Sequence, residues 1–242
     1  MRFTKIPADT FDTIQLNAGI IVDDFTPSTG AIGNLLGATT GGSTFAVSNS
    51  YTDFASDIDN AAKNMMEFKR ADTTEAKLSG TFANITSDLA TILVASGDLS
   101  GRTYTLTSDT AIVTGKTYYT RSGTEGSYVY TKVDTPAVGS ISTYYERDKS
   151  VEKITPRKDL KLSDFRDIWW LGDYSSENGA TNGGFMAIHL MNALSTGGFQ
   201  LKSGDKAKGQ FGFEFTAHGT NADPDKIPYE IYVKQGSAES NS

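Results

Sequence analysis

The segment Gly209–Ala217 reads G-Q-F-G-F-E-F-T-A, and it is the clearest strand in the sequence. Its phenylalanines, Phe211, Phe213 and Phe215, recur at every second position and therefore lie on one face of a strand. The alternate residues, which are polar or small, take the opposite face. A strand with one aromatic and one polar face is typical of a sheet that covers a core on one side. We therefore expect Phe211, Phe213 and Phe215 to pack in the core of the subunit.

The aromatic residues divide the rest of the chain into two regions. Residues 101–149 hold seven of the 11 tyrosines and none of the 13 phenylalanines. Phenylalanine fills buried cores, whereas tyrosine and threonine suit half-exposed sheets. We predict a discontinuous β domain, residues 1–100 and 150–236, which we call the host domain, interrupted by an inserted β module, residues 101–149. The last residues, 237–242, are predicted to be a disordered tail.

The insert repeats itself after a shift of 26 residues, with seven identities in the 19 aligned pairs from Thr103 to Arg121. Each half predicts one hairpin, and two hairpins can share an apolar face. The predicted strands are Thr103–Thr107 with Lys116–Arg121, and Val129–Val133 with Ser142–Arg147. A match produced by composition alone is the alternative, but the constant register favours a true repeat.

Charge and composition narrow the function classes. The 242 residues include 29 acidic and 22 basic ones, a net charge of −7, and no cysteine. Disulfides, thiolate chemistry and cysteine-based metal sites are therefore excluded. The basic residues are not clustered, which argues against tight nucleic-acid binding. No apolar run reaches the about 18 residues of a membrane span, and the first ten residues hold no apolar run of signal-peptide length. We expect a soluble protein made in the cytoplasm, without membrane contact.

The remainder of the host domain predicts antiparallel strands and one helix. The helix begins near Ser87, presents Leu89, Ile92 and Leu93 on one face, and stops by Gly97. The residues Trp169 and Trp170 are adjacent in a predicted strand, so they face opposite sides.

A long segment near the N-terminus, Thr26–Thr44, is rich in glycine, threonine and serine and predicts a mobile loop. It nevertheless carries three apolar residues, Ile32, Leu35 and Leu36, which we expect to contact a neighbouring subunit. Its glycines between Gly37 and Thr44 have P-loop spacing, but Ser43 stands where the phosphate-binding lysine is required. We interpret that stretch as a flexible loop without a nucleotide.

The sequence contains few residues that match the patterns of an active site. The two histidines, His189 and His218, stand without a G-x-S-x-G nucleophile motif and without metal-ligand spacing. We predict no catalytic residues, no metal and no cofactor, and a protein that is not an enzyme.

A likeness to one protein family runs through several segments of the host domain, namely Met66–Arg70, Ala76–Ile85, Ile154–Arg157, Asp164–Tyr174 and Gly183–Gly219. In these segments the chain resembles the major tail proteins, or tail tube proteins, of long-tailed non-contractile phages, particularly those of Gram-positive hosts. None of the segments is a chemical motif, and the module at residues 101–149 is not part of the common core of that family.

The resemblance implies a mainly β fold of two packed antiparallel sheets, a β-sandwich or open barrel, with one flanking α-helix. It also implies that the chain assembles with itself into hexameric rings stacked as a tube. The partners would be the tape-measure protein, the tail terminator and the distal tail proteins, and double-stranded DNA would cross the lumen without specific binding. The protein would be assembled in the cytoplasm of a host bacterium and would reside in the virion tail.

A different class remains open. A carbohydrate-binding or adhesion module on a β-sandwich would use Trp169, Trp170 or the tyrosine-rich insert to stack on sugars. A hydrolase that uses His189 or His218 is the third and weakest interpretation.

Overall fold

The computed structural model describes residues 14–15, 17–54, 59, 65–107, 112–113, 116–125, 127–133, 136, 143–175 and 181–236. The chain divides into two compact units, a larger one (residues 1–96 and 157–242) and a smaller one (residues 97–156). The predicted insert lies inside the smaller unit, which extends further at both ends. The predicted tail, residues 237–242, lies outside the described residues.

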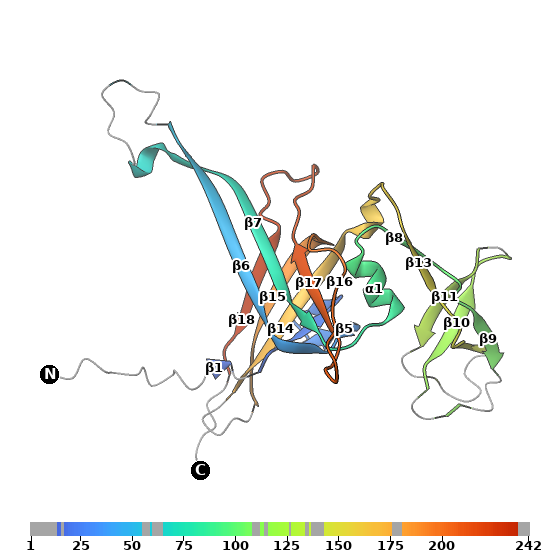
Figure 1. The fold of residues 1–242 in the computed structure, drawn as a ribbon. Helices are drawn as coiled ribbons and strands as arrows, with labels where there is room; N and C mark the ends of the chain where they lie inside the picture. The colour runs from blue at the N-terminus through green and yellow to red at the C-terminus, as the bar shows by residue number, and fades with distance from the viewer. Residues whose placement is uncertain are drawn as a thin grey trace, which may run out of the picture. The chain divides into compact units, whose positions relative to one another are not determined.

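The larger unit is built from antiparallel strands and, in its described part, one α-helix (Figure 1). This confirms the predicted fold class. Its strands are β1 (Ile14–Gln15), β2 (Ile20–Val22), β3 (Phe25–Thr26), β4 (Ala31–Ile32), β5 (Leu35–Gly37), β6 (Thr39–Asp53), β7 (Lys69–Phe82), β14 (Arg166–Ser175), β15 (Thr181–Ser195), β16 (Gln200–Lys202), β17 (Gln210–Thr216) and β18 (Tyr229–Lys234). The helix is α1 (Ser87–Leu93), and two short 3-10 turns are η3 (Met66–Phe68) and η5 (Leu162–Asp164).

Two sheets share the long strand β15. The β14 sheet has the order β5-β2-β14-β15-β18, and β1 adds to the edge of β14. The β17 sheet continues from the far end of β15 through β17 and β7 to β6, with β16 beside β17. Residues 185–190 of β15 pair with β18, whereas Leu194 and Ser195 pair with β17. One strand therefore ties the two sheets together.

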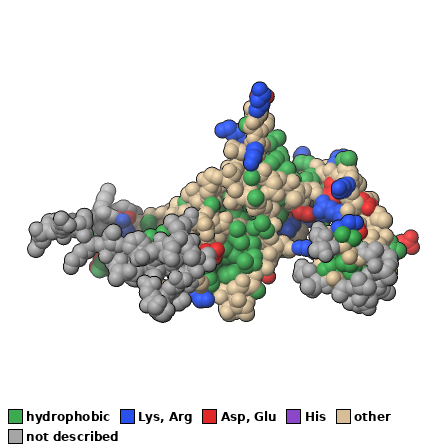
Figure 2. Space-filling view, turned by 90° about the horizontal axis from the view of Figure 1, so that it is seen from below, with side chains coloured by type: hydrophobic (Ala, Val, Ile, Leu, Met, Phe, Trp, Pro, Cys, Tyr) green, Lys and Arg blue, Asp and Glu red, His purple; other side chains and the backbone are tan. Residues whose placement is uncertain are grey.

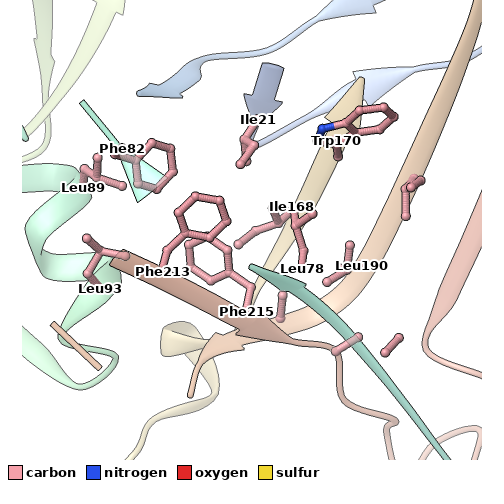
Figure 3. Packing of buried hydrophobic residues seen from close by; sticks show 14 residues of the cluster. Ile21, Leu78, Phe82, Leu89, Leu93, Ile168, Trp170, Leu190, Phe213 and Phe215 are labelled. Atoms are coloured by element: carbon pink, nitrogen blue, oxygen red, sulfur yellow. The ribbon is translucent and has the colours of Figure 1, made fainter. Parts of the chain in front are cut away.

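The main core lies where the two sheets and α1 meet (Figure 3). Its large side chains are Ile21, Leu78, Phe82, Leu89, Leu93, Ile168, Trp170, Ile188, Leu190, Phe213 and Phe215. Phe213 and Phe215 are buried, and Phe211 packs against the cluster while half-exposed. The Phe82 and Phe213 ring centroids are 4.5 Å apart. The aromatic face of β17 is thus the face that the structure buries.

The opposite face of β17 is exposed or half-exposed except at its end. Thr216 is buried there, and its hydroxyl oxygen lies 2.7 Å from that of Thr196. This face carries polar or small side chains as expected, and of them only Thr216 is buried. A threonine can be buried because its single hydroxyl finds a partner.

A second, smaller core covers the other face of the β14 sheet. Trp169 lies in this cluster and Trp170 in the main core, as their adjacent positions in a strand predict. The ring of Phe25, from β3, meets the Trp169 ring edge-on at 5.5 Å.

The segment Thr26–Thr44 is not the predicted loop. It forms β4, β5 and the start of β6, and the register of β6 against β7 shifts between Thr39 and Ser43. Gly41 and Gly42 take positive φ values of 75° and 83° within this bulge. Glycines are typical of loops, but here they bend a strand, which is their other common use.

Helix α1 begins at Ser87 as predicted. The hydroxyl of Thr86 accepts a hydrogen bond from the Leu89 N–H at 3.1 Å, which makes Thr86 the N-cap. The helix ends before the predicted stop at Gly97, because Ala95 has a φ of 67° and cannot continue it.

The smaller unit contains a four-stranded sheet in the order β11-β10-β12-β9 and a two-stranded ribbon. The sheet strands are β9 (Tyr104–Thr107), β10 (Tyr118–Ser122), β11 (Val129–Val133) and β12 (Tyr144–Arg147), and the ribbon strands are β8 (Gly97–Ser100) and β13 (Lys153–Pro156). The predicted hairpins are wrong, because β9 pairs with β12 and β10 with β11. The strands of each repeat therefore pair with those of the other repeat.

The pairing inside this sheet is symmetric. Tyr119 pairs with Tyr145, its equivalent after the shift of 26 residues, at the junction of β10 and β12. The pair Arg121–Tyr130 likewise corresponds to the pair Arg147–Tyr104. A local twofold axis thus passes between Tyr119 and Tyr145. Tyr118 and Tyr144, also equivalent, are both fully buried.

The smaller unit is inserted between Ser96 and Arg157, and hydrogen bonds within the larger unit hold these two residues together. The Arg157 N–H donates to the Ser96 carbonyl at 2.7 Å, and the Ser96 hydroxyl donates to the Arg157 carbonyl at 2.9 Å. The guanidinium of Arg157 also pairs with Asp164 at 2.7 Å.

Truncation of Phe213 to Ala should lower the free energy of unfolding by about 3–5 kcal/mol, because it removes a buried ring between two sheets. Urea unfolding measures this loss. Glu214→Gln is the matched control on the other face: its carboxylate is 3.8 Å from the Lys77 ammonium and partly exposed, so we expect a change of less than about 0.5 kcal/mol. A larger loss for Glu214→Gln would mean that the assigned faces are exchanged.

Deletion of residues 97–156, with Ser96 joined to Arg157 by Gly-Ser-Gly, should leave a soluble larger unit that melts cooperatively. The reason is that two hydrogen bonds already hold Ser96 and Arg157 next to each other. Differential scanning calorimetry measures the transition. A longer deletion that also removes Arg157 is the control and should melt lower. An insoluble first variant would show that the smaller unit is needed for folding of the larger.

Candidate functional site

A cavity of the larger unit with several polar and charged side chains in its lining is built on a row of side chains across the β14 sheet. Val22, Trp169, His189 and Glu230 are cross-strand partners in β2, β14, β15 and β18. Partners in such a row lie on the same face and contact one another. The row places the imidazole of His189 between an indole and a carboxylate.

His189 is held by stacking. Its ring lies on the Trp169 ring with centroids 3.9 Å apart and an angle of 4° between the planes. Its Nε2 is buried, has no hydrogen-bond partner among the described residues, and lies 3.5 Å from Asp167 Oδ2. A relaxation of a few tenths of an ångström would bring this pair to hydrogen-bond distance.

A bulge in β15 brings the second histidine to the same place. Asn192 has a φ of 47°, and its N–H donates to Asp167 Oδ1 at 3.0 Å. The Asn192 side-chain amide then donates to the His218 carbonyl at 3.1 Å. His189 and His218, which are distant in sequence, consequently line one pocket of about 420 Å³.

Burial lowers the pKa of His189, because the charged imidazolium is poorly solvated there; the carboxylates of Asp167 and Glu230 oppose this shift, and Lys226 adds to it. The pKa of Glu230 is lowered chiefly by the hydroxyl of Tyr232, which donates to it. The imidazole of His189 can therefore take up a proton in this pocket, beside the carboxylates of Asp167 and Glu230. Within the described ranges, no three histidine, aspartate or glutamate side chains converge as metal ligands would.

The three residues predicted to contact a neighbouring subunit do not share one environment. Ile32 is 56% and Leu35 55% exposed, whereas Leu36 packs against the main core. Ile32 also borders an apolar pocket of about 360 Å³ with Phe25 and Leu171. The alternation of β5 explains the difference between Leu35 and Leu36, because adjacent residues of a strand face opposite sides.

Both outer strands of the β14 sheet carry exposed apolar side chains. On β18, Ile231 is 50% and Val233 59% exposed; on β5 the exposed residue is Leu35. Among the described strands, β5 pairs only with β2 and β18 only with β15. Figure 2 shows apolar side chains gathered on the face of the larger unit that is seen from below.

A third apolar surface lies on a long two-stranded arm. Strands β6 and β7 continue together beyond the other strands (Figure 1), and Tyr51, Phe54 and Met66 near the end of the arm are exposed. Met66 is 82% exposed. Such side chains on a projecting ribbon are available to another molecule.

The tryptophans are not available to a ligand that stacks on their rings. Trp169 is 5% and Trp170 7% exposed. The prediction that either could stack on a sugar is therefore wrong, because each fills one of the two cores.

Comparison with known proteins returns no match: neither a protein-family model nor a curated protein sequence is similar to this chain. In the part of the chain that the structure describes, no helix has the length and apolar character needed to cross a membrane.

Stability should depend on pH through His189. Its pKa is lower in the folded chain than the ordinary value of 6.5, so the unfolded state binds the proton more readily. The contribution of His189 is complete above pH 6.5 and is lost as the pH falls through the lower folded pKa. Urea unfolding between pH 7.5 and 5.5 should show this decline.

His189→Phe keeps an aromatic ring on Trp169 but cannot titrate, so the decline over this range should flatten. His218→Gln removes the other histidine of the pocket and should retain the decline of the wild type. An unchanged slope in His189→Phe would assign the pH dependence to other groups.

Proposed function

We propose that this protein is a structural subunit of a phage tail tube, in which copies of the chain form hexameric rings that stack around the tape-measure protein and later conduct DNA. One observation carries the proposal beyond the resemblance of the host-domain segments: among the described strands, the β14 sheet ends in two open edges, β5 and β18, at its opposite ends. Copies joined by β5 of one and β18 of the next would extend this sheet around a ring.

Open edges are a liability in a protein that stays monomeric. An edge strand presents unpaired N–H and C=O groups, and most monomers protect such edges with charges, prolines or bulges. Here β18 carries the charged Glu230 and Lys234, but both edges also expose apolar side chains, Leu35 on β5 and Ile231 and Val233 on β18. Because β5 and β18 are different surfaces, their contact is head-to-tail, and a head-to-tail contact closes into a ring when the rotation permits.

The dimensions agree with a tube. If β5, β2, β14, β15 and β18 of each copy enter the wall, a hexameric ring is a barrel of about 30 strands. With strands about 4.8 Å apart and tilted by about 40°, its backbone radius is about 30 Å, which leaves room for duplex DNA after side chains are subtracted. The net charge of −7 per chain favours passage of DNA over binding, since few cations are available to hold phosphates.

The arm formed by β6 and β7 supports the same assembly. In the described residues of its outer part, no side chain belongs to either core cluster, while Tyr51, Phe54 and Met66 are exposed. A ribbon of this kind gains stability when it packs on a second copy. In this proposal the protein resides in the virion tail after assembly in the bacterial cytoplasm, and the His189 pocket has no catalytic role.

Purified wild-type protein should form rings or tubes at high concentration, seen by electron microscopy. Leu35→Asp should block one edge and Ile231→Asp the other, so each variant alone should be monomeric by light scattering. A head-to-tail contact further predicts that an equal mixture of the two forms dimers, because one intact β5 still meets one intact β18. Variants that dimerise alone would show that like edges pair.

Leu162→Asp is the matched control. Leu162 is 92% exposed on η5 and belongs to neither edge strand, so this variant should assemble as the wild type does. Melting temperatures of the edge variants should stay close to that of the wild type. A persistent monomer of the wild type at high concentration would overturn the proposal.

A further inference from the structure

One face of the four-stranded sheet in the smaller unit combines tyrosines with basic side chains. Residues directly opposite each other on neighbouring strands share a face, and the pairs Tyr119–Tyr145, Tyr119–Lys132 and Tyr130–Arg121 define it. We name it the tyrosine face, formed by Tyr104, Tyr119, Tyr130, Tyr145, Arg121 and Lys132.

The tyrosine rings of this face support one another. Tyr104 and Tyr130 stack with centroids 3.8 Å apart, and each meets a second ring edge-on, Tyr119 at 5.1 Å and Tyr145 at 5.4 Å. Tyr104, Tyr119 and Tyr130 are half-buried, so part of each ring remains accessible. The result is a rigid aromatic surface whose hydroxyl groups can act as donors or acceptors.

The charged side chains do not follow the local symmetry of the sheet, because two equivalent arginines have different partners. Arg147 is tied to the carboxylate of Glu152 at 2.6 Å. Its symmetry equivalent, Arg121, instead lies over the rings of Tyr128 and Tyr145, at 4.1 and 4.9 Å from their centroids. In the described part of the chain no carboxylate pairs with Arg121 or Lys132, and both are exposed. The face thus presents two cations without a described counter-ion beside an aromatic surface.

We propose that the tyrosine face binds an acidic saccharide. The C–H faces of sugar rings would lie on the tyrosine rings, sugar hydroxyls would bond to the phenolic groups, and a carboxylate would meet the guanidinium of Arg121 or the ammonium of Lys132. Charge-assisted hydrogen bonds of this kind are the stronger ones. The inference stands apart from tube assembly, since it uses only the smaller unit.

The composition of the chain favours a saccharide over a nucleic acid. Residues 97–156 hold seven acidic and seven basic side chains, so the whole net charge of −7 lies in the larger unit. Tight binding of a phosphate backbone requires a track of cations, whereas the tyrosine face presents two, Arg121 and Lys132, without a described counter-ion. The stacked tyrosines also leave little space for bases to insert between them, whereas a sugar ring needs only the outer surface.

Isothermal titration of the full chain tests the proposal. The probes are short oligogalacturonates, with neutral malto-oligosaccharides and oligo(dT) for comparison. We expect binding of the oligogalacturonates alone, weakened by added salt. The double variant Arg121→Gln, Lys132→Gln should lose affinity by about tenfold or more, as expected when a charge-assisted hydrogen bond is removed.

Thr131→Gln is the matched control, because Thr131 is exposed on β11 but faces the other side of the sheet. It should bind as the wild type does. Absence of oligogalacturonate binding, equal affinity in the double variant, or tighter binding of oligo(dT) would each overturn the proposal. Circular dichroism of the double variant confirms that a loss of binding is not a loss of fold.

Discussion

The passage of β15 from one sheet to the other is the constraint on which the larger unit depends. The strand pairs with β18 up to Leu190 and with β17 from Leu194, and the bulge at Asn192 lies between these two regions. A non-glycine residue at positive φ costs about 1–2 kcal/mol. The Asp167 carboxylate offsets this by accepting the Asn192 N–H. Strands that change sheets at bulges are a common way to make the corner of a sandwich.

This corner determines both the core and the open edges. Beyond Asn192, Ala193 belongs to the same buried cluster as Ile188 and Leu190, so the bulge keeps a continuous apolar face while the strand bends. The outer edge of β15 is divided between β18 and β17, and β18 is left at the end of its sheet. The open edges that we propose for assembly therefore follow from the same bend that organises the core.

Features that depend on local alternation could be predicted from the sequence. The buried face of β17, the opposite orientations of Trp169 and Trp170, and the start of α1 at Ser87 all follow from the periods of a strand and a helix. Features that depend on register could not. Nothing local indicates that β9 pairs with β12, or that a bulge brings His189 and His218 to one pocket, because a strand specifies its partner only through long-range packing. The glycines within Thr26–Thr44 predicted a loop wrongly, because glycine serves loops and bulged strands equally.

The smaller unit shows how a repeat becomes one folding unit. If each half had formed its own hairpin, either could have folded without the other, yet isolated hairpins are marginal in water. Instead, all three strand pairs of the sheet join one half to the other, and Tyr118 and Tyr144 come together at 5.7 Å in a buried position. Although the backbone is symmetric, equivalent charged residues in the two halves can have different partners. Arg147 keeps a structural partner in Glu152, while Arg121 is left to the tyrosine face. The repeat thus supplies the scaffold twice, and the different partners of two equivalent arginines leave Arg121 available to the saccharide that we propose.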